Sequence, residues 1–142
     1  MTRINTIPPE QLTDQHLFAE FREITRVSSL ARPLSEKEQV ADYTMGTGHV
    51  KFFYDKGLFL AKRLEQLQAE LDKRGNINYT VKDYKPHAEG LNNDWEPDKK
   101  AHITNLIRLD SKIREQPKFY RYYSKPVQTD FYLTLIMKTR SK

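Results

Sequence analysis

The spacing of apolar residues between His49 and Arg74 constrains the fold of this chain more than any other feature. Apolar side chains recur there every three or four residues, apart from a gap at Gly57. These side chains are Val50, Phe53, Leu60, Leu64, Leu67 and Leu71. An α-helix brings such positions onto one side, so the pattern predicts a long helix with a buried stripe, closed by Gly75.

A second helix is predicted before this one and a third helix after it. The earlier helix has its N-cap at Thr13 or Asp14 and runs to about Val27. Its buried side is expected to carry Leu17, Phe21 and Ile24. The later helix starts near Pro97, a favourable first-turn position for proline, and ends before Pro117. Its buried side is expected to carry Ile103, Leu106, Ile107 and Ile113.

The segments between these helices are predicted to be mainly loops. A short helix is expected at Ser35–Asp42, and residues 76–94 form a connection that can include one extended piece. With three main helices, long connecting loops and no convincing strand pair, the chain is predicted to be all-α. Its length of 142 residues suits a single compact domain over residues 1–142.

Composition excludes several classes of protein. The chain has no cysteine, so disulfides and thiolate metal sites are excluded. The four histidines (His16, His49, His87 and His102) show no metal-ligand spacing, so we expect no metal and no other cofactor, and His49 is expected to be structural. No segment has the pattern of a signal peptide or approaches the roughly 20 apolar residues that span a bilayer. We therefore expect a soluble, cytoplasmic protein without a membrane partner.

The positive charge is concentrated near the end of the chain. The formal net charge is +5, and residues 112–142 contain 8 lysines and arginines against 2 aspartates and glutamates. The rest of the chain is therefore close to neutral. A positive segment on such a body suits a polyanionic partner, of which nucleic acid is the commonest. A solubilising tail explains the same charge equally well.

The polar side of the first helix carries two arginines. A helical wheel at about 100° per residue places these residues together: Gln15, His16, Ala19, Arg22, Glu23 and Arg26. Arg22 and Arg26 are one turn apart and could clamp phosphates in bidentate geometry, while the small Ala19 leaves room for a backbone. Glu23 could pair with these arginines or take part in chemistry. The alternative is an ordinary solvated face, and the helix by itself favours it.

An aromatic and basic stretch follows Pro117. It contains Phe119, Tyr120, Arg121, Tyr122, Tyr123 and Lys125. The rings could pack under the helices while the cations stay in solvent, and the stretch by itself favours this arrangement. Exposed rings could instead stack on bases, a contact worth about 1–3 kcal/mol per base.

Four motifs of the chain occur in a recognisable order: "TRIN", "DQHLFAEFREITRV", "GTGHVKFFYDK" and "PKFYRYYSK". In this order and at these spacings they resemble the pyrimidine-dimer DNA glycosylase/AP lyase family, the phage endonuclease V type. The resemblance covers residues 2 to about 125 and is patchy over residues 28–43 and 76–98. It implies a single compact all-α domain, in agreement with the helix pattern.

The resemblance also implies roles for individual residues. The α-amine of Thr2, free once Met1 has been removed, would be the nucleophile, and Glu23 would be the essential carboxylate. The residues expected to bind DNA or line the site are Arg3, Gln15, His16, Arg22, Arg26, Phe119, Tyr120, Arg121, Tyr122, Tyr123 and Lys125.

The chain departs from the family pattern at three places. Phe119 stands where the family usually has tryptophan, and Ser124 stands where it usually has glycine. Both departures bear on lesion specificity. Residues 126–142 form a C-terminal extension past the family's usual end, and its apolar stretch at 131–137 could pack on the body or meet a partner.

An α-amine suits an enzyme that removes a base and then cleaves the strand. Its reference pKa is about 7.7–8.0, against about 10.4 for lysine, so a useful fraction is neutral near pH 7. Nearby cations such as Arg3 and Arg22 would favour the neutral form further. Glu23 could stabilise positive charge on the sugar, as carboxylates do in glycoside hydrolysis, or shuttle the proton for elimination.

The resemblance therefore implies a DNA-repair glycosylase with AP lyase activity that excises ultraviolet-induced cyclobutane pyrimidine dimers through a Schiff-base intermediate. Its partner would be damaged double-stranded DNA, and we expect a monomer in a bacterial or phage-infected cell, associated with the nucleoid through DNA. One alternative is the same chemistry on another damaged or modified base. Two others are a non-catalytic DNA-binding protein of this fold and a basic helical interaction protein.

Overall fold

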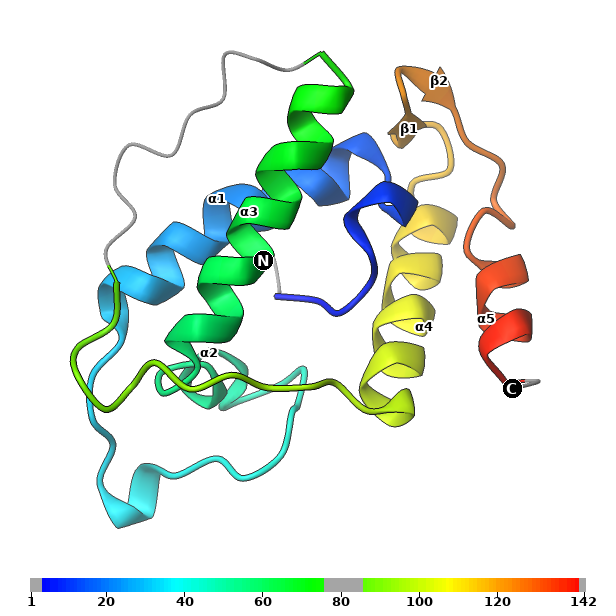
Figure 1. Ribbon diagram of the computed structural model, residues 1–142. Coiled ribbons are helices and arrows are strands. Elements are labelled where there is room, and N and C mark those ends of the chain that lie inside the picture. The colour runs from blue at the N-terminus through cyan, green and yellow to red at the C-terminus, as the bar shows by residue number, and fades with distance from the viewer. Residues whose placement is uncertain (1–3, 76–85, 141–142) are drawn as a thin grey trace. The chain divides into compact units, whose positions relative to one another are not determined.

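The computed structural model describes residues 4–75 and 86–140, and these residues are mostly helical (Figure 1). Three α-helices of 17 residues each are the main elements: α1 (Asp14–Leu30), α3 (Gly57–Lys73) and α4 (Lys99–Glu115). The shorter helices are the 3-10 helices η1 (Pro9–Gln11) and η2 (Glu36–Glu38), with α2 (His49–Phe52) and α5 (Leu133–Arg140). The prediction of a mainly helical chain is confirmed, and α5 is a further helix beyond the three that were predicted.

A short hairpin departs from the predicted all-α fold. Strands β1 (Arg121–Tyr122) and β2 (Lys125–Pro126) pair antiparallel, with Tyr122 opposite Lys125. The two turn residues, Tyr123 and Ser124, have φ angles of 49° and 69°. Both lie in the left-handed region, as a two-residue type I′ turn requires. The expectation that the chain has no strand pair is therefore wrong at this hairpin.

The described residues divide into two compact units. The first unit comprises Ile4 with residues 18–75 and 86–96, and it contains most of α1 together with α2 and α3. The second unit comprises residues 5–17 and 97–140, and it contains η1, the first residues of α1, α4, the hairpin and α5. The single domain over residues 1–142, with residues 126–142 as an extension, stays a prediction.

In the first unit, α1 and α3 lie side by side (Figure 1) and bury the apolar stripes that the sequence indicated. The buried residues of these stripes are Phe21, Ile24, Phe53, Leu60, Leu64, Leu67 and Leu71. Val50, predicted for the same stripe, is partly exposed. The spacing of apolar residues therefore locates the core of this unit in all but one position.

The long helix predicted for His49–Arg74 is wrong in one respect, because it is interrupted before Gly57. The Gly57 N–H donates to the Leu91 carbonyl at 2.9 Å. A Cβ atom at Gly57 would collide with the side chains of Asn92 and His87. A segment more than 30 positions away in sequence thus takes the hydrogen bond that a continuous helix would have used. The gap at Gly57 in the apolar pattern marks the same interruption.

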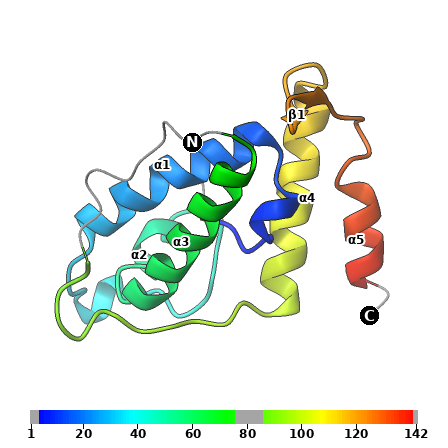
Figure 2. The ribbon, with the colours of Figure 1, turned by 45° about the horizontal axis from the view of Figure 1, so that its top comes forward.

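In the second unit, α4 and α5 lie side by side (Figure 2). α4 begins two residues after Pro97, where the Asp98 side chain accepts the Ala101 N–H at 2.8 Å. Its buried side carries Ala101, Asn105, Leu106, Leu109 and Ile113. Ile107, predicted to be buried, is 44% exposed, because the positions one turn apart from 101 to 113 define the buried side and Ile107 lies off it.

The remaining boundaries differ from the predictions by a few residues. Thr13 is the N-cap of α1, since its Oγ1 accepts the His16 N–H at 3.2 Å, and the helix continues three residues past Val27. The helix expected at Ser35–Asp42 is only the short η2. In the predicted connection over 76–94, residues 76–85 lie outside the described residues. None of the helices in the described part of the chain is long and apolar enough to cross a membrane.

Candidate functional site

The N-terminal segment is anchored at Ile4. Thr2 and Arg3 lie outside the described residues, and the described chain begins at Ile4, which is fully buried. The Ile4 N–H donates to His49 Nε2 at 2.9 Å, and the Tyr43 hydroxyl donates to the Ile4 carbonyl at 2.7 Å. Both backbone groups of Ile4 are therefore satisfied inside the first unit. The residue two positions after Thr2 is held in place.

His49 holds Ile4 as a neutral ring. Its Nδ1 lies 2.6 Å from the Thr44 carbonyl oxygen, which can only accept, so Nδ1 carries the proton. Nε2 is then the acceptor that the Ile4 N–H needs. The ring is 2% exposed and makes edge contacts with Tyr43 and Phe53, at centroid distances of 5.4 and 5.5 Å. This arrangement gives His49 the structural role that the sequence indicated.

Three of the predicted site residues lie on α1 within the first unit. Arg22 is exposed and the Arg26 side chain is 72% exposed, whereas the Glu23 side chain is only 13% exposed. Arg26 Nη1 lies 3.5 Å from Glu23 Oε2, which is a loose ion pair. The helix thus presents a mostly buried carboxylate beside two accessible guanidiniums. Such a group can hold phosphates around an acidic residue.

A buried ion pair determines which side of α1 faces solvent. Arg63 of α3 donates from Nε and Nη2 to the two carboxylate oxygens of Glu20, at 2.7 and 2.9 Å. The two side chains are 5% and 0% exposed. Rotation of α1 about its axis would leave both charges buried and unpaired, which is strongly unfavourable. The pair therefore keeps Arg22 outward and Glu23 at the border of the buried side.

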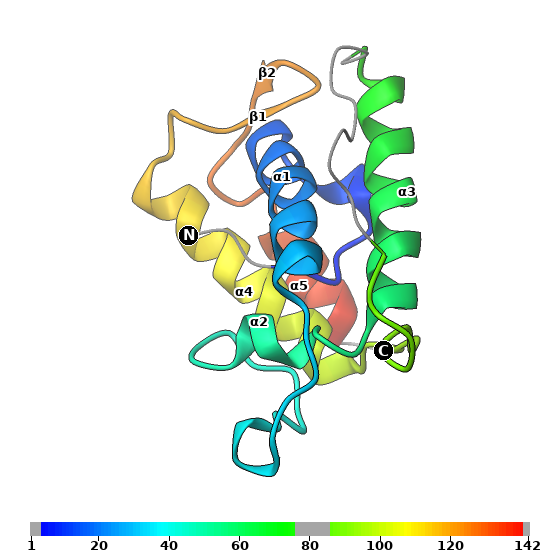
Figure 3. The ribbon, with the colours of Figure 1, turned by 90° about the vertical axis from the view of Figure 1, so that its left-hand side faces the viewer.

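In the second unit, the first turn of α1 holds the hairpin (Figure 3). The Asp14 carboxylate accepts the backbone N–H groups of Tyr123 and Ser124, at 3.1 and 2.9 Å. Gln15 Oε1 accepts the Arg121 N–H at 2.8 Å. The predicted site residue Gln15 thus lies against the aromatic stretch, with its side-chain oxygen already used to position that stretch.

His16 lies beside the hairpin with its ring enclosed. The ring stacks on Tyr120 at a centroid distance of 4.6 Å and an interplanar angle of 27°. Its Nδ1 lies 2.8 Å from Thr13 Oγ1 and 3.3 Å from the Tyr132 hydroxyl. Its Nε2 is buried and has no hydrogen-bond partner among the described residues. The structure therefore brings Gln15, His16 and the predicted aromatic stretch together.

The surroundings of His16 keep its ring neutral. Burial is the largest cause, and the nearby cations Arg108 and Lys112 add to it, so that the pKa of His16 falls from 6.5 to about 3. Both cations belong to α4 and are one turn apart. His16 is therefore a neutral, polar group in basic surroundings at any physiological pH.

The aromatic stretch has both buried and exposed rings. Tyr120 is 8% exposed, whereas Phe119 is 54% exposed and touches Tyr120 edge-to-face at 5.0 Å. The Tyr122 hydroxyl donates to the Glu10 carbonyl at 2.6 Å. Lys125 is exposed, and Arg121 and Tyr123 are partly exposed. Tyr120 therefore packs in the interior, whereas Phe119 lies at the surface.

Residues 1–88 match the family model described as pyrimidine dimer DNA glycosylase. The chain belongs to the pyrimidine dimer DNA glycosylase family. This membership implies a glycosylase that acts on damaged DNA. The matched part contains Thr2, Arg3, Gln15, His16, Arg22, Glu23 and Arg26. The aromatic stretch of the hairpin lies outside it.

Sequence reasoning did not single out several residues that build the site of this pyrimidine dimer DNA glycosylase family member. Glu20 and Arg63 gave no signal, because the partners are 43 positions apart. Asp14 stood out only as a candidate cap, although its carboxylate holds the hairpin turn. The four-residue spacing of Arg108 and Lys112 was the one available signal for the basic group beside His16.

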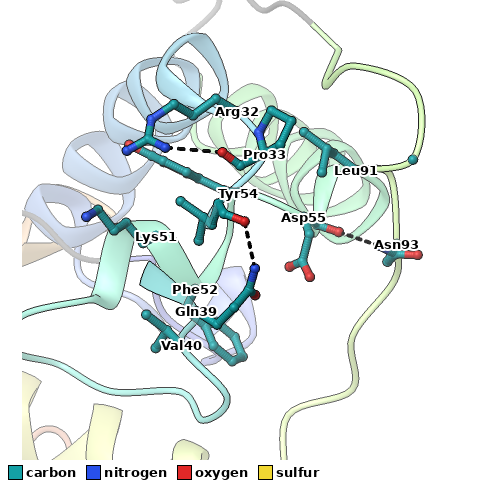
Figure 4. Close-up of a pocket in the computed structure, with 12 residues that line it drawn as sticks. Arg32, Pro33, Gln39, Val40, Lys51, Phe52, Tyr54, Asp55, Leu91 and Asn93 are labelled. Atoms are coloured by element: carbon teal, nitrogen blue, oxygen red, sulfur yellow. Dashed lines mark hydrogen bonds between the residues drawn. The ribbon is translucent and has the colours of Figure 1, made fainter. Parts of the chain in front are cut away.

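A separate cavity of about 240 Å³ lies in the first unit (Figure 4). Arg32 and Lys51 on its wall share the carboxylate of Glu38, with shortest distances of 2.6 and 3.2 Å, so each of the two cations already has an acidic partner. None of its described lining residues is a predicted site residue of the family. Among residues 4–75 and 86–140, no group of three or more His, Cys, Asp or Glu residues could hold a metal ion.

Proposed function

We propose that this chain is a DNA glycosylase with AP lyase activity that excises ultraviolet-induced cyclobutane pyrimidine dimers. One observation carries the proposal: the family match includes both Thr2 and Glu23. An amine and a carboxylate are the two groups that this chemistry needs, and DNA binding alone needs neither of them.

The first chemical step releases the base. The neutral α-amine of Thr2 attacks C1′ of the damaged nucleotide while the C1′–N bond breaks. The base leaves the sugar with the bonding electrons and takes up the proton that the attacking nitrogen gives up, and it stays joined to the second pyrimidine of the dimer. The sugar ring then opens as the amine lone pair forms a C=N⁺ bond and the ring oxygen is protonated. Glu23 stabilises the positive charge that grows on the sugar.

The second step cleaves the strand. The iminium acidifies the C2′–H, and Glu23 accepts that proton. The electrons of the C–H bond form a C2′=C3′ double bond, the C3′–O bond breaks, and the 3′ phosphate leaves. Water then hydrolyses the iminium, which restores the amine and releases the sugar fragment as an aldehyde.

The anchorage of Ile4 supports the role of the amine. Consecutive Cα atoms are 3.8 Å apart, so the Thr2 Cα lies within about 8 Å of the Ile4 Cα. Both backbone groups of Ile4 are hydrogen-bonded, so the chain to which Thr2 is joined is anchored at Ile4. A restricted nucleophile reacts faster than a freely moving one, because less orientational freedom is lost on the way to the transition state.

Exposed cations and one exposed ring support DNA binding. We assign phosphate contacts to Arg22 and Arg26, which are both exposed on α1, and to Arg3. Further contacts come from the residues around the hairpin: Gln15, His16, Arg108, Lys112, Tyr120, Arg121, Tyr122, Tyr123 and Lys125. Phe119 has the most exposed ring of this stretch, and we assign to it the stacking on a base at the lesion.

The departure from the family pattern at Ser124 does not argue against the dimer substrate. Glycine is the residue that adopts positive φ most easily, and Ser124 stands where the resemblance leads one to expect it. Ser124 nevertheless has a φ of 69°, and the Asp14 carboxylate holds its N–H. Ser124 therefore adopts the positive φ that a glycine at this position would allow. Extruding a nucleotide costs a few kcal/mol, and least where damage has already weakened its stacking.

Borohydride trapping tests the proposal. The protein is incubated with borohydride and one of three duplexes that carry a thymine dimer, an abasic site or no damage. We expect a covalent adduct with the first two duplexes and none with the third. An adduct with the abasic duplex alone would keep the amine but refute the dimer as substrate. No adduct with either damaged duplex would refute the enzyme.

An N-terminal extension provides the control for the nucleophile. One residue added before Thr2 turns the reactive amine into an amide nitrogen, so both activities should disappear while the fold is kept. Thr2→Ser retains the α-amine and should retain activity, with mass spectrometry confirming the first residue of each protein. Cleavage at a normal rate by the extended protein would show that Thr2 is not the nucleophile.

A further inference from the structure

The segment that follows the hairpin is joined to the second unit through Tyr132. This residue directly precedes α5 and has no exposed surface, although neighbouring Leu133 and Met137 are 39% and 64% exposed. Its ring contacts Phe131 at 4.9 Å, and Phe131 contacts Tyr122 of the hairpin at 5.3 Å. Tyr132 is therefore a packed part of the unit that holds His16.

The Tyr132 hydroxyl binds the start of α1. It accepts the Thr13 N–H at 3.0 Å, which satisfies a buried backbone donor directly before the helix. The same hydroxyl lies 3.3 Å from His16 Nδ1. A tyrosine hydroxyl has one proton to donate and can accept as well, so it can serve both neighbours at once.

This contact bears on the state of the His16 ring. A neutral imidazole carries its proton on one nitrogen only, and the hydrogen bond at the other nitrogen decides which. A proton donated to Nδ1 by Tyr132, or by Thr13 at 2.8 Å, leaves the ring proton on Nε2. That nitrogen is buried and has no partner among the described residues, so its N–H is an unsatisfied donor in the free protein.

We propose that Tyr132 is a positioning residue for DNA binding, whose hydroxyl holds the first turn of α1 and orients the His16 ring through Nδ1. The oriented Nε2–H is buried in the free protein and donates to a DNA oxygen once DNA binding has uncovered it. The DNA part of this inference rests on the proposed function, whereas the contact between Tyr132 and His16 does not. The extension beyond the hairpin is in this view a component of the site.

The test uses the full chain with two variants. Tyr132→Phe keeps the ring and its packing and removes only the hydroxyl. Ile136→Val is the matched control, because Ile136 is also buried, at 6% exposure, and lies one turn after Tyr132 in α5. Both variants are compared with the unchanged chain at a temperature at which all three are folded.

The first measurement is the ¹⁵N shifts of the histidine ring nitrogens by NMR. The unchanged chain should show His16 as one neutral tautomer with the proton on Nε2. In Tyr132→Phe the His16 Nδ1 resonance should move or split between tautomers, and Ile136→Val should leave it in place. If Tyr132 served only to fill space, removing its hydroxyl would not shift the His16 Nδ1 resonance more than Ile136→Val does. Identical His16 resonances in all three proteins would overturn the proposal, whatever the enzymatic activity.

The second measurement is affinity for a duplex that contains a tetrahydrofuran abasic analogue, which cannot form an imine. Tyr132→Phe should bind about 2- to 10-fold more weakly, the range that one lost hydrogen bond implies, and Ile136→Val should bind normally. A shifted His16 signal with unchanged affinity would overturn the DNA role of Tyr132. A failure of the unchanged chain to trap on damaged DNA would refute the proposed function, while the NMR result would still decide the contact.

Discussion

At the scale of single residues, two carboxylates one turn apart on α1 have opposite surroundings. Glu20 is fully buried and bound bidentately by Arg63, whereas Glu23 is 13% exposed and has only a loose contact with Arg26. A carboxylate whose charge is already matched by a guanidinium serves stability. One without such a partner can respond to charge that develops on a substrate. The surroundings therefore assign the structural role to Glu20 and leave Glu23 for chemistry.

This contrast predicts that substitution of Glu23 lowers activity with little effect on stability, whereas substitution of Glu20 lowers stability with little effect on activity. Glu23→Gln should lower dimer cleavage about 10²- to 10⁴-fold, because the proton-accepting charge is lost. It should change the free energy of unfolding by less than about 1 kcal/mol, since the loose pair with Arg26 is worth little. Cleavage assays and denaturant titrations measure the two effects.

Glu20→Gln is the matched control. It should lower the free energy of unfolding by about 3–5 kcal/mol, because Arg63 is left buried without its partner. Cleavage per folded molecule should stay near normal. A Glu23→Gln protein that cleaves at the normal rate would exclude Glu23 as the catalytic carboxylate.

The contact between His49 and Ile4 leads to a second prediction. His49→Phe keeps an aromatic ring in the cluster but leaves the buried Ile4 N–H without an acceptor, so the free energy of unfolding should fall by about 1–3 kcal/mol. The rate of borohydride trapping should fall as well, because the segment that carries the amine is released. Denaturant titration and a trapping time course measure both.

Tyr43→Phe removes the other hydrogen bond to Ile4 and completes a double-mutant cycle. Because both side chains hold the same residue, their effects on trapping should be non-additive. Two additive effects on the trapping rate, or a normal trapping rate in the double variant, would mean that the hydrogen bonds to Ile4 do not affect the reaction of the amine.

At the scale of elements, the hairpin depends on a turn that its own residues favour only weakly. Tyr123 and Ser124 both have positive φ, a conformation that costs non-glycine residues roughly 1–2 kcal/mol each. Two hydrogen bonds to Asp14 offset this strain. The local sequence and the tertiary contact thus oppose each other at this turn, and the contact prevails.

Ser124→Gly should therefore stabilise the protein. The gain should be about 0.5–1 kcal/mol, because the relief of strain exceeds the extra flexibility of glycine in the unfolded chain. Ser124→Ala is the control, since alanine keeps the Cβ atom and should bring no gain. Thermal unfolding of the three proteins measures the difference. A gain from alanine equal to that from glycine would show that strain at φ is not the cause.

The elements also show how far the sequence could predict this fold. Periodicity located α1, α3 and α4, because the buried side of a helix is encoded within the helix itself. It did not reveal the interruption before Gly57, which depends on Leu91 and Asn92 packing from a distant segment. The same limit applies to the site. Spacing placed Arg22, Glu23 and Arg26 on one polar face and the family resemblance gave them roles, but the burial of Glu20 became visible only with its partner on α3.

At the scale of the whole molecule, His16 couples stability to pH. Its pKa is about 3 in the folded protein and about 6.5 in the unfolded chain. Between these values the unfolded state binds a proton that the folded state does not, so stability rises with pH over this range. The contribution is fully present above pH 6.5 and is lost as the pH falls toward 3.

Because of His16, the free energy of unfolding is expected to fall by about 2 kcal/mol between pH 7 and pH 5. Denaturant titrations of the unchanged chain and of His16→Gln at both pH values test it, and the unchanged chain should lose about 2 kcal/mol more than the variant. Burial also lowers the pKa of His87, but that residue titrates in both proteins and cancels in the difference. Equal losses in the two proteins would mean that His16 is accessible to protons in the folded state.

The buried pair of Glu20 and Arg63 also has an evolutionary consequence. Replacing either residue alone leaves an uncompensated charge in the core, whereas replacing both with apolar residues of similar volume is often tolerated. Any path from the charged pair to an apolar one therefore passes through a strongly destabilised intermediate. Among relatives of this chain, positions 20 and 63 should change together or not at all, and the rotational setting of α1 should be inherited with them.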